Sequence, residues 1–519
     1  MSQTLSDGTP EVAPAIEVTL LDRILDQGGL VRVARLDSDA DEAAKAEAAR
    51  AEAQARSKAL GLLKEFVDRV VANTSTVSQD VTQRINDCIA EIDRLISVQL
   101  NEVIHHPDCQ RLEASWRGLH DLVMNTETGV RLKLRLLNVS KSDLLKDLKN
   151  AIEFDQSALF KKVYEDEYGT FGGNPYSVLV GDFEFGPAAQ DVELLAKISN
   201  VAAAAHAPFI TAASPAMFFM DSFTDLPAPR DLAKIFESSD FADWRAFRAS
   251  EDSRYVALTM PRVLQRLPYG KDTVPVEGMG FEEDVDGTDH SKYLWGSSAY
   301  KLALRITDAY AMYGWTAAIR GVEGGGKVEG LPAHSYKVYK NKPDDKSKAL
   351  YCPTEIAITD RREKELNDLG FLALLHHKGE NFAAFFGGQT AQKPNTDYAS
   401  DKANANARLS AMLPYVLTAS RFAHYLKVSM RDKIGSFMTK ENVQTFLNLW
   451  IGEYVLGKDD AGQALKARYP LREARVDVFD TPGKPGVYTA TVFLRPHFQL
   501  EELTTSIRLV AELPPPVAA

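Results

Sequence analysis

A glycine-rich segment of the sequence is spaced like a loop that binds nucleotide phosphates. Residues 321–328 (GVEGGGKV) nearly match G-x-x-x-x-G-K-[ST], in which glycine N–H groups surround the phosphates and the lysine, here Lys327, reaches them. The hydroxyl residue that ligates magnesium is replaced by Val328. Such a loop must open into a helix, yet Gly330 and Pro332 follow closely. We interpret the segment as a tight loop packed against a neighbouring element.

Other reactive side chains do not form a convincing site. Residues 105–109 (HHPDC) group possible metal ligands, but a zinc site usually needs a second pair downstream, and none is evident. His376 and His377 follow an apolar run and are expected to end a strand. Cys352 would need an oriented base to act as a nucleophile, and it fits a buried thiol better. The sequence therefore predicts no catalytic residues, no metal and no cofactor.

A helix expected over residues 415–433 is basic, although the formal net charge of the chain is −12. That net charge argues against a general nucleic-acid binder. A solvated face is the simplest interpretation of the helix, and an electrostatic contact with an acidic partner is the alternative. The candidate contact residues are Arg421, Lys427, Arg431 and Lys433, with His424 between them.

The elements around these residues begin with a short amphipathic helix. Residues 1–17 are polar and expected to be disordered, residues 18–27 (VTLLDRILDQ) form the helix, and Gly28 and Gly29 end it. Residues 30–36 could continue as an extended arm. The helix either docks on its own domain or serves as a recognition peptide for a groove. Its apolar residues are Leu20, Leu21, Ile24 and Leu25.

Residues 37–125 are predicted to be helical and residues 126–470 to form a mixed α/β core. Apolar residues recur at helical spacing over residues 76–101, and such a stripe needs a covering surface, here expected on a second polypeptide. In the core, strands are expected at 130–139, 176–180, 208–212, 255–260, 316–319 and 357–358. Helices are expected at 141–153, 188–205, 232–238, 300–313, 360–369 and 405–427, and a surface linker at 389–403.

Residues 471–519 are predicted to form a β arm. Strands are expected at 475–480, 487–494 and 506–510, with turn residues 481–486 (TPGKPG) after the first. A two-stranded hairpin is marginal alone, and its free N–H and C=O groups call for a partner strand. We therefore expect strand exchange between subunits. The expected inter-protomer strand contains Val487, Tyr488, Thr489, Ala490, Thr491, Val492, Phe493 and Leu494.

Residues 470–514 (PLREARVDVFDTPGKPGVYTATVFLRPHFQLEELTTSIRLVAELP) resemble the C-terminus of the TssC (VipB) family, the large subunits of the type VI secretion contractile sheath. The similarity extends through residues 106–123 (HPDCQRLEASWRGLHDLV), 244–270, 295–332, 352–388 and 407–438. The resemblance implies a structural protein, not an enzyme, with a sheath-protein core.

The same resemblance implies the partners. The chain would pair obligately with the small subunit TssB, polymerise with other sheath protomers around a tube of Hcp, and meet a baseplate. It also implies that the ATPase ClpV takes the N-terminal helix containing Leu21 and Leu25. Two alternatives stay open: a phage-tail-like sheath outside type VI, which the N-terminal helix argues against, and a nucleotide-binding α/β enzyme.

Composition indicates the compartment. The three cysteines, Cys88, Cys109 and Cys352, form no disulfide framework, which suits a reducing cytosol. The first residues (MSQTLSDGTPEVAP) do not have the pattern of a signal peptide, and no run of about 18 apolar residues occurs. We expect a cytoplasmic protein without membrane insertion.

Overall fold

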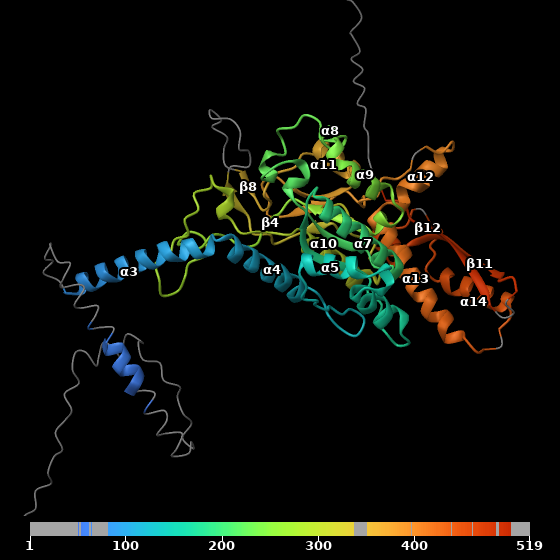
Figure 1. Ribbon diagram of the computed structural model, residues 1–519, viewed down its shortest axis with the longest axis horizontal. Coiled ribbons are helices and arrows are strands. Elements are labelled where there is room, and N and C mark those ends of the chain that lie inside the picture. Colours follow the sequence, from blue (N-terminus) through green and yellow to red (C-terminus); the bar gives the residue numbers. More distant parts are fainter. Residues whose placement is uncertain are drawn as a thin grey trace, which may run out of the picture. The chain divides into compact units, whose positions relative to one another are not determined.

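The computed structural model describes residues 50, 53–61, 64, 81–336, 350–395, 397–436, 438–458, 460–483 and 487–499. The chain divides into two units, Met1–Ile96 and Ser97–Ala519. In the first unit, residues 53–61 are helical and helix α3 (Val81–Ile104) begins. The elements described below belong to the second unit (Figure 1).

A six-stranded mixed sheet lies at the centre of the second unit, as the sequence predicted. Its order is β1-β2-β3-β9-β10-β6, and its first four strands run parallel, whereas β10 is antiparallel to both of its neighbours. The strands are β1 (Leu179–Phe185), β2 (Phe209–Ala213), β3 (Val256–Met260), β9 (Phe371–His376), β10 (Ala383–Phe385) and β6 (Lys327–Val328). Two short antiparallel pairs, β4 (Val263–Leu264) with β5 (Trp295–Gly296) and β7 (His334–Tyr336) with β8 (Leu350–Cys352), lie outside this sheet.

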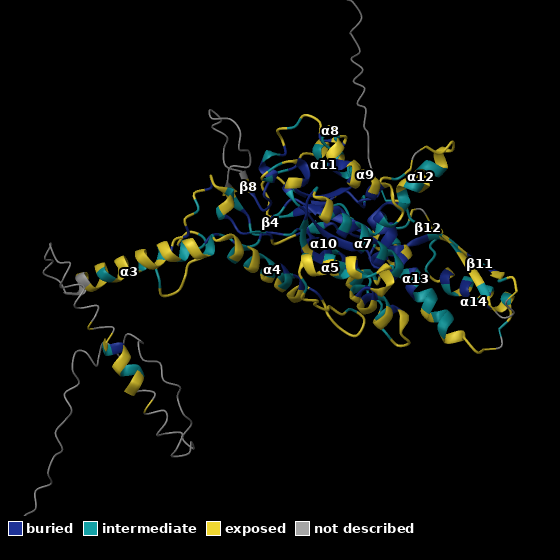
Figure 2. Ribbon diagram, viewed as in Figure 1, coloured by how far each residue is buried: buried dark blue, intermediate teal, exposed yellow. Residues whose placement is uncertain are grey.

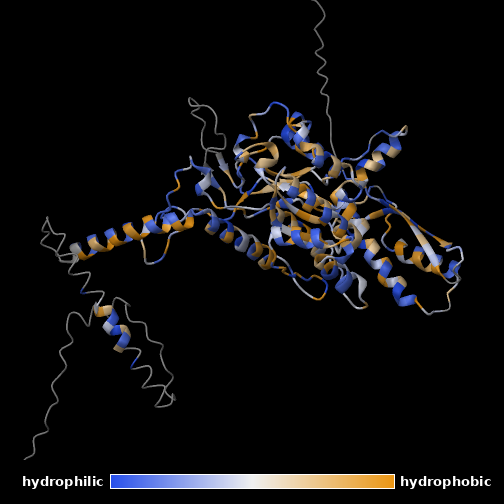
Figure 3. Ribbon diagram, in the orientation of Figure 1, coloured by the Kyte–Doolittle hydropathy of each residue, from blue (hydrophilic) through white to orange (hydrophobic). Residues whose placement is uncertain are grey.

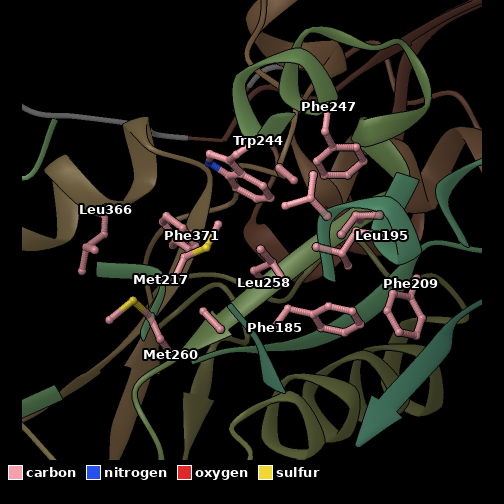
Figure 4. Close-up of a cluster of buried hydrophobic side chains, with 14 of the residues drawn as sticks. Phe185, Leu195, Phe209, Met217, Trp244, Phe247, Leu258, Met260, Leu366 and Phe371 are labelled. Atoms are coloured by element: carbon pink, nitrogen blue, oxygen red, sulfur yellow. The ribbon is translucent and has the colours of Figure 1, made fainter. Parts of the chain in front are cut away.

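Side chains alternate across this sheet and build a hydrophobic core on each face. On β9, Phe371 belongs to one core and Leu372 to the other. Helix α7 (Ala189–Ala205) packs on the first face and α10 (Ala299–Tyr313) on the second. Figure 4 shows Trp244 beside Phe371 in the first core, with ring centroids 6.0 Å apart. Helices cover both faces, as is usual for largely parallel strands.

The other helices of the second unit lie around the six-stranded sheet or before and after its strands in the sequence. They are α4 (Pro107–Met124), α5 (Lys141–Asn150), α6 (Ala158–Phe160), the π-helical turn Lys161–Gly169, α8 (Ala233–Phe236), α9 (Ala242–Ala249), α11 (Asp360–Asp368), α12 (Asp401–Ser410), α13 (Leu413–Lys433), α14 (Lys440–Gly452) and α15 (Gln463–Arg468). Pro107 occupies the first turn of α4, where its missing N–H costs no hydrogen bond.

A separate core lies under the C-terminal hairpin. Strands β11 (Leu471–Asp480) and β12 (Tyr488–Pro496) pair antiparallel. Buried residues of β11 pack against the buried face of α14 and against Phe422 of α13, whose ring stacks on Trp315 with centroids 4.5 Å apart. The hairpin is therefore anchored to the body of the unit by its first strand.

Several expected elements differ from the structure. Residues 130–139, 316–319 and 357–358 form no strand, and the helix expected at 405–427 is divided between α12 and α13. The surface linker expected at 389–403 is wrong for its first part, because residues 389–392 contain the buried Thr390 and Ala391. Both the N–H and the hydroxyl of Thr390 donate to the Ala411 carbonyl at the break between α12 and α13. This pairing joins residues 21 positions apart, so no periodic pattern of neighbouring residues could reveal it.

Candidate assembly surfaces

The two strands of the C-terminal hairpin differ in how far they are buried. On β11, Leu471, Val476 and Val478 are buried. On β12, Thr489, Ala490 and Thr491 are exposed, and Phe493 is 49% exposed (Figure 2). The expected inter-protomer strand therefore lies mainly in β12, with Val487 just before it.

Side chains of α14 close the free edge of β11. The amide of Asn448 pairs with both backbone groups of Val476, accepting from its N–H at 3.0 Å and donating to its carbonyl at 2.8 Å. The side-chain oxygen of Gln444 accepts from the N–H of Val478 at 3.3 Å. At the start of the strand, Leu471 bonds through its N–H and carbonyl to the backbone at residues 454 and 456. The edge of β11 is thus occupied at three points.

The free edge of β12 has no such cover among the described residues. In an antiparallel pair, both backbone groups of a residue point either toward the partner strand or away from it, in alternation. Val476 faces α14 and lies opposite Val492, so the backbone groups of Val492 point away from β11. By the same alternation, the groups of Ala490 and Leu494 also point outward. The sheet contains only β11 and β12 in the described part of the chain.

The basic helix α13 bonds to its own chain. Arg421 donates to the Ser177 hydroxyl at 3.1 Å. The Lys427 ammonium lies 3.5 Å from the centre of the Tyr168 ring, and Arg431 donates to the backbone carbonyls of Tyr168 and Thr170. Lys433 is exposed, although its ammonium lies 4.8 Å from the centre of the Phe446 ring.

A histidine lies buried beneath this basic face. His424 is 2% exposed, and its Nε2 donates to the carbonyl of Ala205 at 2.8 Å. Burial lowers the pKa of His424 to about 4, and the positive charges of Arg421 and Lys427 act in the same direction. The ring is therefore neutral near pH 7 and joins α13 to the end of α7.

Residues 105–109, where the sequence groups possible metal ligands, are used for packing. His106 caps α4 through its Nδ1, which accepts from the N–H of Asp108. His105 lies 3.3 Å from Glu283, a buried carboxylate that pairs with Arg266 at 2.6 Å. Arg266 also pairs with Glu113 of α4 at 2.9 Å. This ionic cluster fastens α4 to residues 266–283, and the described residues contain no group of three or more potential metal ligands.

The glycine loop packs against β10, in line with the interpretation drawn from its sequence. The N–H of Gly321 donates to the Phe385 carbonyl at 2.7 Å, and the N–H of Phe385 donates to Gly326. A Cβ at Gly325 would lie 2.2 Å from the Ala318 carbonyl oxygen, so the loop admits no side chain there. Strand β6, not a helix, follows the loop, and Lys327 pairs with Glu329.

The remaining reactive residues also have structural surroundings. Cys352 is buried, and its sulfur lies 3.2 Å from the hydroxyl of Thr354. His376 ends β9, as expected, and its Nε2 lies 2.9 Å from the carbonyl oxygen of Glu380. His377 stacks on Phe382 with ring centroids 4.7 Å apart.

Helix α3 and helix α4 each carry exposed apolar residues. On α3, apolar residues at helical spacing form one stripe, visible as bands in Figure 3. Trp116 of α4 is 61% exposed, which is large for a tryptophan on a folded helix. The exposed apolar residues of the two helices are Ile85, Ile89, Ile92, Leu95, Ile96, Val98, Val103, Leu112, Trp116, Val123 and Met124.

Other predicted segments lie outside the described residues. These are the N-terminal helix with Leu20, Leu21, Ile24 and Leu25, the arm at 30–36, and the third C-terminal strand at 506–510. Within the part of the chain that the structure describes, no helix combines the length and hydrophobicity needed to cross a membrane.

Sequence reasoning did not identify Gln444 and Asn448 as edge-closing residues. Their spacing of four places them on one face of α14, but nothing local distinguishes them from solvated amides. It also missed the cluster of Glu113, Arg266 and Glu283, whose members are far apart in the chain.

Comparisons with known proteins define the class of this chain. Residues 86–392 match the VipB model, described as EvpB/VC_A0108, tail sheath N-terminal domain. Residues 402–513 match the VipB_2 model, described as EvpB/VC_A0108, tail sheath gpW/gp25-like domain. The chain belongs to the VipB (TssC) family of type VI secretion tail sheath proteins.

A curated relative agrees with this assignment. The type VI secretion system sheath protein TssC1 of Pseudomonas aeruginosa is 50% identical over 464 residues, covering 89% of this chain and 92% of that protein.

Solved contractile injection systems show lower similarity. The anti-feeding prophage baseplate (12% identity, TM-score 0.34) matches 62% of this chain and 66% of that one. The contracted PVC sheath complex (9%, TM-score 0.31) matches 61% and 68%, and the contracted anti-feeding prophage sheath (12%, TM-score 0.30) matches 73% and 99%. The family assignment rests on the sequence matches.

Proposed function

We propose that this chain is the large subunit of a type VI secretion contractile sheath, working in the cytoplasm. It would pair with TssB, polymerise helically around an Hcp tube and contract to propel that tube. Family membership and 50% identity to a TssC1 protein over most of the chain support this proposal. The structural observation that supports assembly best is the β11–β12 hairpin, which is closed on one edge and open on the other.

The open edge of β12 would bind a strand of a neighbouring protomer. Strand addition supplies main-chain hydrogen bonds, while side chains that alternate along the strand set the register. The outward groups of Ala490, Val492 and Leu494 are the donors and acceptors for it. Residues 471–519 would thus form the arm that connects protomers.

The helical region, residues 37–125, would pair with TssB. The apolar stripe of α3 supports this, because Ile85, Ile89 and Ile96 are each more than 40% exposed along one helix. Obligate interfaces bury on the order of 2,000–5,000 Å² and are rich in such residues. The amphipathic helix at 18–27 would be the segment taken by ClpV after contraction.

The core, residues 126–470, would supply the contacts that rearrange during contraction. A difference of a few kcal/mol per protomer between two packings suffices for a two-state change, and many copies sum to a large energy. No nucleotide is needed at the sheath in this scheme. The basic helix α13 would meet an acidic partner, the inner tube or the next sheath subunit, mainly through its exposed Lys433.

Electron microscopy of the chain co-expressed with TssB tests the proposal. We expect hollow helical tubes that sediment with both subunits. A soluble monomer that does not bind TssB but binds ATP in an equilibrium assay would support the enzyme alternative and contradict the sheath role. A Lys327→Ala variant is the control for that assay, because it removes the lysine of the glycine loop.

A further inference from the structure

A segment of the second unit has a strand-like sequence but pairs with no strand among the described residues. Residues 131–139 (RLKLRLLNV) alternate in the manner of a β-strand, yet they belong to no sheet. The carbonyl of Leu132, which accepts from Gly129, is the one backbone group among them that bonds to described backbone. Leu136 is 69% exposed and Leu137 is 49% exposed. Because most of its backbone groups bond to no described backbone, this apolar segment presents a free backbone edge.

Side chains join this segment to the residues that precede β1 at a constant spacing along the chain. The Lys133 ammonium donates to the Asn174 side chain at 3.1 Å, and Arg135 donates to the Tyr176 hydroxyl at 3.2 Å. Each pair is separated by 41 residues in the chain. Just after the segment, Lys141 at the start of α5 donates to the Glu184 carbonyl of β1 at 2.8 Å. The segment thus runs in the same direction as β1 and the residues before it.

The main sheet also ends at this place. Strand β1 pairs only with β2 among the described residues, so its other edge is open. The long side chains of the segment contact Asn174 and Tyr176, just before β1, where a backbone ladder would join neighbouring strands. Both free backbones accept the same kind of ligand, which is another extended chain.

The charge of the segment indicates which kind of extended chain would bind to it. Residues 130–139 contain Arg131, Lys133 and Arg135 and no acidic residue, in a chain of net charge −12. Arg135 pairs with Glu167 of the same chain, so Arg131 and Lys133 are the basic side chains left to meet a partner. A strand with carboxylates on one face and apolar residues on the other complements this composition. The free strand of a second copy does not, because β12 contains no acidic residue and one arginine, Arg495.

We propose that residues 132–138 are a docking strand for an extended segment of a different polypeptide, apolar on one face and acidic on the other. The identity of that polypeptide rests on the proposed function, and we assign it to the small sheath subunit. Its strand pairs with the free backbone of residues 132–138 and continues the main sheet beyond β1. The sequence pattern that predicts a strand at 130–139 is then satisfied only in the complex.

Amide hydrogen exchange on the purified complex with the small subunit tests this directly. We expect alternate amides of residues 132–138 to exchange at least about 100-fold more slowly than an unstructured peptide, as paired strands do. Exchange within about tenfold of the unstructured rate would overturn the proposal. Protection that appears in polymerised sheath but is lost in the isolated heterodimer would assign the edge to a second copy, which also overturns it.

Proline variants supply a matched test. Neighbouring N–H groups of a strand point to opposite sides, so only one of Leu136→Pro and Leu137→Pro removes a donor that faces the partner. We expect one of the two to reduce co-purification of the small subunit at least tenfold, whereas Leu136→Ala and Leu137→Ala, which keep the N–H, reduce it much less. Full binding by both proline variants would contradict the docking strand.

A charge variant addresses the acidic partner. Arg131 is exposed. Arg131→Glu should weaken co-purification several-fold, and Arg131→Lys should not. Equal binding by both variants would overturn the acidic character of the partner strand. A wild-type chain that forms no complex at all would contradict the proposed function instead, so the two failures differ.

Discussion

The side-chain amide of Asn448 pairs with Val476 as a strand backbone would, with its oxygen 3.0 Å from the Val476 nitrogen and its nitrogen 2.8 Å from the Val476 carbonyl. An edge strand with free hydrogen-bonding groups is a template for unwanted pairing. Here a helix supplies the cover without adding a strand. Among the described residues, only the β12 edge of the hairpin is therefore left open.

Removing this amide should both destabilise the hairpin and open its protected edge. Asn448→Ala leaves two buried backbone groups of Val476 without partners, which costs about 1–3 kcal/mol. We expect a lower melting temperature for the purified complex and irregular aggregates in negative stain. Gln444→Ala is the control, since it removes a single, longer bond, and its effect should be smaller. Equal effects from both would contradict the larger contribution that we assign to Asn448.

A pair of proline substitutions on β12 should separate hairpin folding from lattice formation. Ala490→Pro removes an N–H that points away from β11, so the hairpin should form while long sheaths do not. Thr491→Pro removes an N–H that faces β11 and should disrupt the hairpin itself, at roughly 3 kcal/mol or more by analogy with interior helix proline. Both variants should still bind TssB. Normal-length tubes from Ala490→Pro would refute strand exchange at this edge.

Truncation after Lys484 extends this test, because it removes β12 entirely. The truncated chain should co-purify with TssB through its helical region and fail to polymerise. Sedimentation of the complex reports both properties at once. Polymers of normal length would move the lattice contacts into the α/β core.

Charged substitutions in the N-terminal helix should affect recycling without affecting assembly. Leu21→Asp combined with Leu25→Asp removes two apolar anchors, worth roughly 4 kcal/mol or about a thousandfold in affinity for ClpV. Sheath yield should be unchanged, and ATPase binding should be lost in a pull-down. Failed assembly would instead place this helix in the folded protomer.

Stability should fall with acid in the range set by His424. Its pKa is lowered by burial to about 4 in the folded chain, against an ordinary value near 6.5, so the unfolded chain binds the extra proton first. This contribution is fully present above pH 6.5 and is lost as pH falls toward 4, roughly 3 kcal/mol in total.

The variant His424→Gln should make stability less sensitive to pH in that window. Tyr168, His206, Arg421 and Lys427 surround the ring, and burial lowers the pKa of His206 as well. A residual slope of the same sign is therefore expected. Melting temperatures of wild type and variant at pH 7.5 and 5 measure the difference. Parallel curves would show that His424 does not titrate as described.

The chain expressed without its partner should aggregate. The apolar stripe of α3, the free edge of β12 and the exposed segment at 131–139 each present surface that a monomer does not protect. Co-expression with TssB should restore solubility. A monodisperse, soluble monomer obtained without any partner would contradict the obligate pairing.

Local patterns predicted those elements whose structure is determined nearby. Helices α5, α7, α10 and α11 begin within one residue of their expected starts, because their local residue patterns mark them. Strand alternation at 475–480 and 487–494 likewise located β11 and β12. The short strands β6 and β10 carry no comparable pattern.

What the sequence could not show depends on residues distant in the chain. The basic residues of α13 look solvated until Tyr168, Thr170 and Ser177 are placed beside them. The strand pattern at 130–139 is real, but a strand needs a partner, and none of the described residues provides one. Local propensity indicates which element a segment can form, but it does not identify the strand that pairs with it.

A hairpin with one closed edge and one open edge can add only one further strand. On the proposed assembly, each hairpin accepts a single strand, so the number of strand contacts made through the hairpins cannot exceed the number of subunits, and branching through this sheet is excluded. One end of such a lattice always carries a row of unfilled β12 edges. That row is either where the next subunits join or where a different protein must terminate the polymer.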